Sequence, residues 1–189
     1  NWRGPFKGTG TLPLHGYHRR LAKVEENVLS DEACERFYTL LSESERPLIY
    51  AGGGVINANA TKPMRRLANE YGIPVTTTLM ALGASDTTHP LALHMLGMHG
   101  LASANYAVED CDFLIAIGAR FDDRVAGNPG QFAPRAKNVA HFDVDFAEIG
   151  KVKRANWHHV GILERDLTDM LAYGRRIGFS KDFKTWHAE

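Results

Sequence analysis

The sequence predicts an α/β fold of the Rossmann-like type, with a doubly wound parallel sheet. Short apolar runs such as residues 113–117 do not alternate with polar residues, which is typical of strands buried on both faces. Segments of helical length separate these runs, and a regular alternation of strand and helix indicates βαβ units. Glycines follow the run at residues 48–51 at once, which places a turn at its end.

Capping and breaking residues place the elements in order. Ser30 followed by Asp31 and Glu32 predicts a helix start, because a capping hydroxyl and acidic residues favour the first turn. A second helix is expected from Thr61 to Tyr71, closed by Gly72. The remaining elements are predicted as strands at 48–51, 73–78, 113–117, 139–143 and near 160–162, and helices at 101–109 and 165–173.

The ends of the chain differ from its middle in composition. The first twenty residues lack periodicity, so we interpret residues 1–29 as a linker that arrives from an upstream domain. Residues 30–178 are expected to form the central α/β domain, and residues 179–189 a polar tail toward a downstream domain. The chain also begins without Met, so we expect it to be a piece of a longer protein.

Composition narrows the classes of function. Lys plus Arg and Asp plus Glu both number 22, so the formal net charge is zero and neither nucleic acid nor a membrane surface is an expected partner. No apolar run approaches the roughly 20 residues of a membrane span, and no signal peptide is evident. Cys34 and Cys111 form no C-x-x-C pair and are expected to be free thiols in a reducing, cytoplasmic compartment.

The polar and glycine-rich segments follow predicted strands. Right-handed crossovers place the carboxyl ends of parallel strands at one edge of the sheet, where small ligands bind in open α/β folds. We therefore expect a small-ligand site at this edge. The segments that would form it are residues 52–54, 78–82, 94–100, 118–124 and 143–145.

The glycine run at residues 52–54 has two interpretations of equal weight. It lets backbone N–H groups approach a phosphate or dinucleotide closely, or it makes a tight turn between a strand and a helix. The G-x-G-x-x-G fingerprint and the Lys-Ser/Thr pair of a P-loop are both missing. A standard NAD(P) or ATP site is therefore not supported.

The charged segment Arg120, Asp122, Asp123 and Arg124 is either a solvated loop or a ligand contact. Its position after a buried strand, with Phe121 in its middle, favours the second interpretation. Arg at such a position can bind phosphate or carboxylate through two hydrogen bonds, and a neighbouring Asp can hold it in place.

Further residues at this edge also have two interpretations. Asp143 and Asp145 either accept hydrogen bonds from a ribose or cap the segment 146–150. Met80, Met95 and Met98 could line a flat aromatic ligand, although each is individually more typical of a core.

No metal site and no catalytic nucleophile are predicted. Gly97 separates His94 from His99 and argues against one helical face, and zinc sites usually have tighter ligand spacing. Ser85, Ser103 and Cys111 lack a recognisable catalytic partner.

Taken together, these segments resemble the central domain of the acetolactate synthase (acetohydroxyacid synthase) large-subunit family, whose members depend on thiamine diphosphate. The resemblance spans roughly residues 46–165, and its specificity comes from the order and combination of the segments. The similar stretches are residues 46–54, 72–80, 93–100, 105–109, 118–124 and 141–150.

The resemblance implies that this domain binds FAD in an extended pose, without a net redox role for the flavin. Asp143 and Val144 would lie on the adenosine side, while Asp123 and Arg124 would point into the substrate channel that leads to the thiamine site. The cofactor-binding residues carried over by motif are Gly53, Thr78, Leu79, Leu96, Gly97, Met98, His99, Gly118, Arg120, Asp122, Asp143 and Val144.

The resemblance also implies the reaction of the whole protein. Pyruvate would be decarboxylated, and the two-carbon unit would pass to pyruvate or 2-oxobutyrate, in branched-chain amino-acid biosynthesis. Thiamine diphosphate and Mg²⁺ would bind to domains outside this chain, so the fragment alone is expected to be inactive. A homodimer or tetramer is implied for the full-length protein, with a regulatory subunit as a further candidate partner.

Two departures keep alternatives open. Thr11 stands where the family often has Arg before Leu-Pro, so Arg19 or Arg20 would have to supply a phosphate contact. Ile162 stands where the family has Asp, which removes a polar contact near the flavin. The alternatives are a related thiamine enzyme of the glyoxylate carboligase or pyruvate oxidase type, or a non-catalytic α/β module that has lost nucleotide binding.

Overall fold

The computed structural model describes residues 15–188 and is built around a parallel sheet with the strand order β3-β2-β1-β4-β5-β6. Each pair of neighbouring strands runs in parallel, which confirms the predicted doubly wound fold. The order reverses between β1 and β4, so the ligand-binding switch point of such folds lies there. The strands are β1 Pro47–Ala51, β2 Val75–Thr77, β3 Ala92–Met95, β4 Phe113–Ile117, β5 Asn138–Asp143 and β6 Trp157–Val160.

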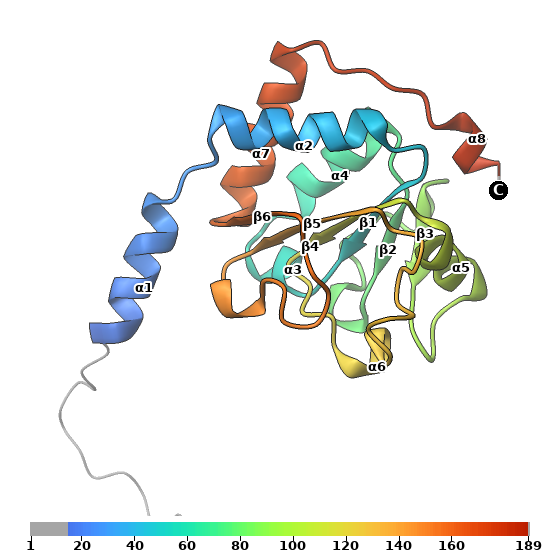
Figure 1. Ribbon diagram of the computed structural model, residues 1–189, viewed down its shortest axis with the longest axis horizontal. Helices are drawn as coiled ribbons and strands as arrows, with labels where there is room; N and C mark the ends of the chain where they lie inside the picture. The colour runs from blue at the N-terminus through green and yellow to red at the C-terminus, as the bar shows by residue number, and fades with distance from the viewer. Residues whose placement is uncertain (1–14, 189) are drawn as a thin grey trace, which may run out of the picture.

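Helices α2, α4 and α7 together cover one face of the sheet, while α1 extends away from the body of the domain (Figure 1). The α-helices are α1 His15–Glu26, α2 Asp31–Glu43, α3 Gly54–Asn57, α4 Thr61–Tyr71, α5 Ala102–Asp110, α6 Asp123–Ala126, α7 Leu163–Arg176 and α8 Lys184–His187. Two short 3-10 turns, η1 Leu79–Ala81 and η2 Phe146–Glu148, follow β2 and β5.

Aromatic side chains fill the core on both faces of the sheet. On the face covered by α2, the ring of Phe37 packs against Phe113 and Trp157 with centroids 5.7 and 5.4 Å apart. On the other face, Tyr50 of β1 packs against Phe121 and Phe132, which belong to the segment between β4 and β5. Each such ring contributes about 1.5–3 kcal/mol when fully buried. Because both faces are covered, the strands read as continuous apolar runs.

The predicted capping signals are confirmed at two helices. The side chain of Ser30 accepts a hydrogen bond from the backbone N–H of Ala33 at the start of α2. Gly72 adopts a left-handed conformation with φ of +63° directly after α4. Both helices therefore begin or end at the residue that the local chemistry dictates.

The last strand begins and ends earlier in the sequence than predicted, since the prediction placed it near 160–162. The strand β6 ends at Val160, and Gly161 and Ile162 lead directly into α7. The strand is carried instead by Trp157 and His159, whose side chains are buried while His158 between them is exposed. Two adjacent histidines, His158 and His159, concealed this period of two, because one is exposed and the other is buried.

Some elements were not predicted at all. Strand β3 was expected to be loop, α6 was expected to be irregular, and α1 lies inside the segment interpreted as a linker. In the segment interpreted as a tail, the indole Nε1 of Trp186 donates a hydrogen bond to the carbonyl of Pro47 at 3.0 Å. The ring of Phe183 is buried as well, so the end of the described chain packs on the domain.

Candidate functional site

The turns that follow β1 and β4 touch each other at the switch point. The backbone N–H of Gly54 donates a hydrogen bond to the carbonyl of Gly118 at 3.0 Å. A Cβ atom on Gly54 would lie 2.7 Å from the Cα of Gly118, and Gly118 itself has a φ of +57°. Glycine is therefore required at both positions, because the two backbones approach more closely than side chains allow.

The turn after β1 also contacts the segment after β2. A Cβ atom on Gly53 would lie 2.9 Å from the Cβ of Met80, and one on Gly52 would lie 2.2 Å from the carbonyl oxygen of Gly118. The tight-turn interpretation thus accounts for the glycine run without a ligand. A phosphate-binding role for Gly53 is compatible with this geometry but is not needed to explain it.

The segments 94–100 and 118–124 lie against each other, as the sequence predicted. Gly97 has a φ of +96°, and a Cβ atom on it would lie 3.2 Å from the carbonyl oxygen of Arg124. The imidazole of His99 and the thioether of Met98 are exposed beside this contact. Leu96 is different, because its side chain is only 3% exposed and belongs to the core. Only its backbone could reach a ligand.

Asn105 on α5 holds the segment 94–100 in place, and sequence reasoning gave it no separate role. Its Oδ1 accepts a hydrogen bond from the N–H of Gly97 at 2.8 Å, and its Nδ2 donates to the carbonyl of Gly97 at 3.1 Å. An Asn in the first turn of a helix is usually interpreted as a solvated polar residue. Its partner eight residues earlier becomes evident only when the loop is folded.

The charged segment is organised around Asp122. Its Oδ2 lies 3.5 Å from Nη2 of Arg120, and its Oδ1 accepts a hydrogen bond from the N–H of Arg124, which caps α6. Contact with the Asp123 side chain, this backbone bond and the two nearby guanidinium groups lower the pKa of Asp122. The Arg120 side chain is 70% exposed, so most of its donors remain available to a ligand.

Phe121 is the strained residue of this segment. Its φ is +55°, a conformation that costs a residue other than glycine about 1–2 kcal/mol, yet its ring is buried. The ring packs against Tyr50, Phe132 and His141 with centroids 5.2 to 5.9 Å apart. These contacts hold the backbone in place and turn the flanking charged side chains outward.

Asp143, the last residue of β5, and Asp145 make different contacts. The Oδ1 of Asp145 accepts a hydrogen bond from the N–H of Ala147 at 2.9 Å, so Asp145 caps η2. The Oδ1 of Asp143 accepts from the N–H of Asp145 at 3.0 Å, and its other oxygen lies 3.7 Å from Nε2 of the buried His141. The capping interpretation is thus correct for Asp145. The carboxyl of Asp143 is mostly enclosed, while Val144 is exposed.

An apolar surface surrounds these loops. The side chains of Leu79 and Met98 are 66% and 78% exposed, and Met80 is exposed to a similar degree. Thr78, at the start of η1, has a buried Oγ1 with no hydrogen-bond partner among the described residues. Exposed large apolar side chains next to an unsatisfied buried hydroxyl are typical of a surface that a ligand or another domain covers.

A groove of about 490 Å³ lies between the end of α1 and the segment after β5. Arg20 and Lys23 of α1 line one side, and Val144 and Phe146 line the other. Arg20, one of the two candidates for a phosphate contact, therefore reaches this groove. Arg19 does not line it.

Hydrogen bonds attach the C-terminal end of α1, and Asn27 just after it, to the domain beside this groove. The guanidinium of Arg165 donates to the carbonyls of Glu25 and Asn27, each at 2.8 Å. The Nδ2 of Asn27 donates to the carbonyl of Val160 at 2.7 Å. The wall that carries Arg20 and Lys23 is thus attached to β6 and α7.

Metal clusters, membrane-spanning helices and reactive thiols are the other features that could indicate a function in residues 15–188. In this range no group of three or more His, Cys, Asp or Glu residues is placed to hold a metal ion. No helix in the same range is both long and apolar enough to cross a bilayer. Burial raises the pKa of the Cys34 thiol to about 11 and that of Cys111 to about 12, so both thiols are protonated at neutral pH.

Curated relatives of the chain carry names of one kind. It is 53% identical over 147 residues to a probable acetolactate synthase large subunit of Methanocaldococcus jannaschii. This aligned stretch covers 78% of this chain and 24% of the relative. It is 43% identical to the acetolactate synthase isozyme 1 large subunit of Escherichia coli over 87% of this chain and 28% of the relative. It is 44% identical to acetolactate synthase 1, chloroplastic, of Zea mays over 94% of this chain and 27% of the relative. The chain thus spans 24–28% of the length of these relatives.

A family model gives the assignment of the domain. The model described as "Thiamine pyrophosphate enzyme, central domain" matches residues 34–170. This range begins in α2 and ends in α7, so it includes the whole parallel sheet and the loops at its carboxyl edge. The chain therefore belongs to the thiamine pyrophosphate enzyme central-domain family.

Proposed function

We propose that this chain is the FAD-binding central domain of an acetolactate synthase, which condenses two 2-oxo acids with loss of CO₂. The names of the relatives support this activity over that of a glyoxylate carboligase or a pyruvate oxidase. The observation that carries FAD binding is the meeting of the loops after β1, β2, β3 and β4 beside the switch point. Dinucleotides bind at this position in doubly wound sheets.

The residues at this edge fit a flavin on several counts. The buried Oγ1 of Thr78 has no hydrogen-bond partner within residues 15–188, which costs about 1–3 kcal/mol unless a ligand supplies one. The exposed side chains of Leu79, Met80 and Met98 offer a flat ring an apolar surface, to which thioethers are well suited. We assign the flavin side of the site to these residues, together with Gly53, Gly97 and His99.

The phosphates and the adenosine need cations and a second surface. Among the described residues, the guanidinium of Arg120 forms an ion pair only with Asp122, so it keeps donors for a phosphate. We assign the adenosine end to the groove beside Val144 and Phe146. Arg20 and Lys23 on its opposite wall supply cations for a phosphate, in place of the Arg that the entering segment lacks, and Glu26 and Asp145 also line the groove.

The remaining assignments concern parts outside this chain. Asp123 and Arg124 are exposed on α6 next to Gly97, and we assign them to the channel that leads toward the thiamine site. Thiamine diphosphate and Mg²⁺ would be held by other domains of the whole protein, which would assemble as a dimer or tetramer, with a regulatory subunit as a further partner. The isolated chain is then expected to bind FAD but to form no acetolactate.

Titration of the purified chain with FAD, followed by flavin fluorescence, tests the proposal. We expect a micromolar Kd for the chain and a loss of at least about tenfold in the Arg120→Ala variant, as for one charge-assisted contact. Arg135→Ala, which alters an exposed arginine paired with Asp110 away from these loops, is the matched control and should bind FAD unchanged. A chain that does not bind FAD at 100-fold higher concentration (about 100 μM) would instead be a module that has lost nucleotide binding.

A further inference from the structure

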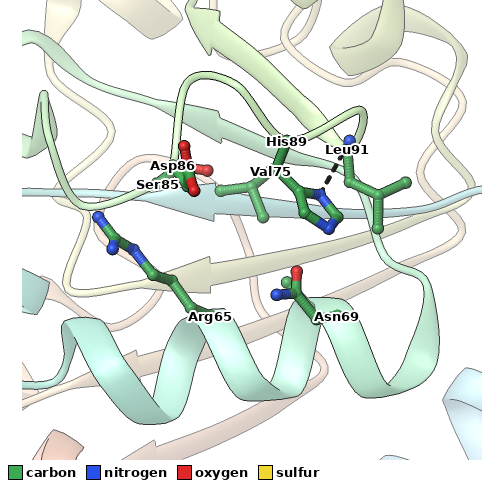
Figure 2. Close-up of a pocket in the computed structure, with 8 residues that line it drawn as sticks. Arg65, Asn69, Val75, Ser85, Asp86, His89 and Leu91 are labelled. Carbon is green, nitrogen blue, oxygen red and sulfur yellow. Dashed lines mark hydrogen bonds between the residues drawn. The ribbon is translucent and has the colours of Figure 1, made fainter.

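A second cavity lies at the opposite end of the sheet from the carboxyl edge. Its volume is about 100 Å³, and it lies between α4 and the segment that joins η1 to β3 (Figure 2). Val75, the first residue of β2, and Leu91, just before β3, form its apolar wall. The cavity is therefore separate from the loops assigned to FAD. It is large enough for several water molecules or one small ligand.

Two opposite charges border this cavity without pairing with each other. The Nε and Nη2 atoms of Arg65 donate to the carbonyls of Ala84 and Gly83, each at 2.7 Å. The Oδ1 of Asp86 accepts from the N–H and the hydroxyl of Thr88 at 3.0 and 2.7 Å. Within the described residues, no nitrogen of Arg65 lies within 4.0 Å of an oxygen of Asp86. Each charge is thus held in position by other partners.

Both of these groups carry their charge at neutral pH. The hydrogen bonds from Thr88, with smaller effects of Arg65 and His89, hold the pKa of Asp86 below its usual range. Arg is protonated at any physiological pH. Figure 2 shows Arg65 and Asp86 toward one end of the cavity, with His89 and Asn69 farther along it. The lining of the cavity therefore includes a cation and an anion, each held by other partners.

Two polar side chains that keep unused hydrogen-bonding atoms among the described residues face the rest of the cavity. The Nδ1 of His89 accepts a hydrogen bond from the N–H of Leu91 at 3.2 Å, so a neutral ring carries its proton on Nε2 and can donate it. The side-chain amide of Asn69 makes no hydrogen bond to another described residue. Both groups lie beside the apolar wall of Val75 and Leu91.

We propose that this cavity binds a small α-amino acid in its zwitterionic form. The ligand's carboxylate would contact Arg65, and its ammonium group would contact Asp86. A short side chain would lie against Val75 and Leu91. A simple anion or cation would satisfy one of the two fixed charges and meet repulsion from the other, whereas a zwitterion carries both charges on adjacent atoms.

Three probes of nearly equal size separate a zwitterion from a simple ion. Alanine carries both charges, propionate lacks the ammonium group, and alaninamide lacks the carboxylate. Titration of the ¹⁵N-labelled chain, followed by amide chemical shifts, should give a millimolar Kd for alanine, with shifts confined to residues 65–69, Val75 and residues 83–91. Propionate and alaninamide should each bind at least about tenfold more weakly, the effect of one lost charge contact.

Asp86→Asn is the variant that tests the ammonium contact. The amide retains an oxygen that can accept the bonds from Thr88, so the local turn should persist. The variant should bind alanine no better than propionate, whereas Asp182→Asn, on an exposed residue far along the chain, should leave alanine binding unchanged. An unaltered amide spectrum away from residues 83–91 would establish that the variant is folded.

Two results would overturn the proposal. Equal binding of propionate and alanine by the unmodified chain would make the cavity a simple anion site. An absence of shifts at residues 83–91 up to about 50 mM alanine, well above a millimolar Kd, would mean that the cavity holds only water.

Discussion

Substitution of Gly118 by Ala should destabilise the domain through the contact between the turns after β1 and β4. Two effects add together at this position. The φ of +57° costs a non-glycine residue about 1–2 kcal/mol. The new Cβ atom would also lie 2.7 Å from the Cα of Gly54 and 2.9 Å from its carbonyl carbon. Both are backbone atoms, so no side chain can move aside to relieve the clash.

The size of the effect follows from these two parts. Overpacking of this kind typically costs about 1–3 kcal/mol, so the total loss should be about 2–5 kcal/mol. For a chain of this length, each kcal/mol lowers the Tm by about 2–4 °C. Thermal unfolding followed by circular dichroism should therefore show a Tm lower by about 4–20 °C. Flavin binding should weaken as well, because the loops on both sides of the switch point would shift.

Gly178→Ala is the matched control for the backbone strain alone. Its φ of +64° is similar, but a Cβ atom there would meet nothing within 4 Å. This variant should lose only about 1–2 kcal/mol. If Gly118→Ala and Gly178→Ala lowered the Tm equally, the contact between the two turns would not limit stability, and the reasoning would be refuted.

Three further predictions concern single side chains. Asn105→Ala should lower the unfolding free energy by about 1–3 kcal/mol and weaken FAD binding, because the N–H and carbonyl of Gly97 lose their partners. An unchanged FAD affinity would show that the segment 94–100 needs no support from Asn105. Trp186→Phe should cost about 0.5–1.5 kcal/mol in denaturant unfolding through loss of the bond to Pro47, and a neutral result would mean that the end of the chain is not docked in solution. Because burial raises the pKa of Cys34 from 9.0 to about 11, its contribution to stability is complete below pH 9 and is lost as the pH rises toward 11. The unfolding free energy of Cys34→Ala should therefore fall less over that range than that of the unmodified chain.

The regular parts of the fold could be predicted because their local signals agree with their burial. Helix α4 has the predicted bounds, since Gly72 supplies the left-handed residue that ends it. Strand β4 also has the predicted bounds, because every side chain of the strand is buried. Strand β3 could not be predicted in this way. It is a half-exposed edge strand, and His94 within it has a φ of +61°.

The candidate site was predictable in position but not in its internal contacts. Parallel topology alone brings the glycine turn after β1 to the turn after β4. The sequence could not show that Gly54 and Gly118 are needed for the contact between their own backbones rather than for a ligand. That requirement depends on a distance across the sheet. The clamp of Asn105 on Gly97 and the enclosure of Asp143 by its own turn are likewise tertiary facts. Sequence patterns report which loops meet, and packing decides which groups remain free to bind.

Hydrogen exchange of the chain with and without FAD tests the central claim most directly. If the carboxyl edge is the flavin site, FAD should slow amide exchange in residues 78–82, 96–99 and 118–124 and leave residues 83–91 unchanged. The groove beside Val144 and Phe146 should be protected as well if it receives the adenosine. Protection outside these segments, the turn at Gly53 and the walls of the groove, or no protection in these segments at saturating FAD, would contradict the account.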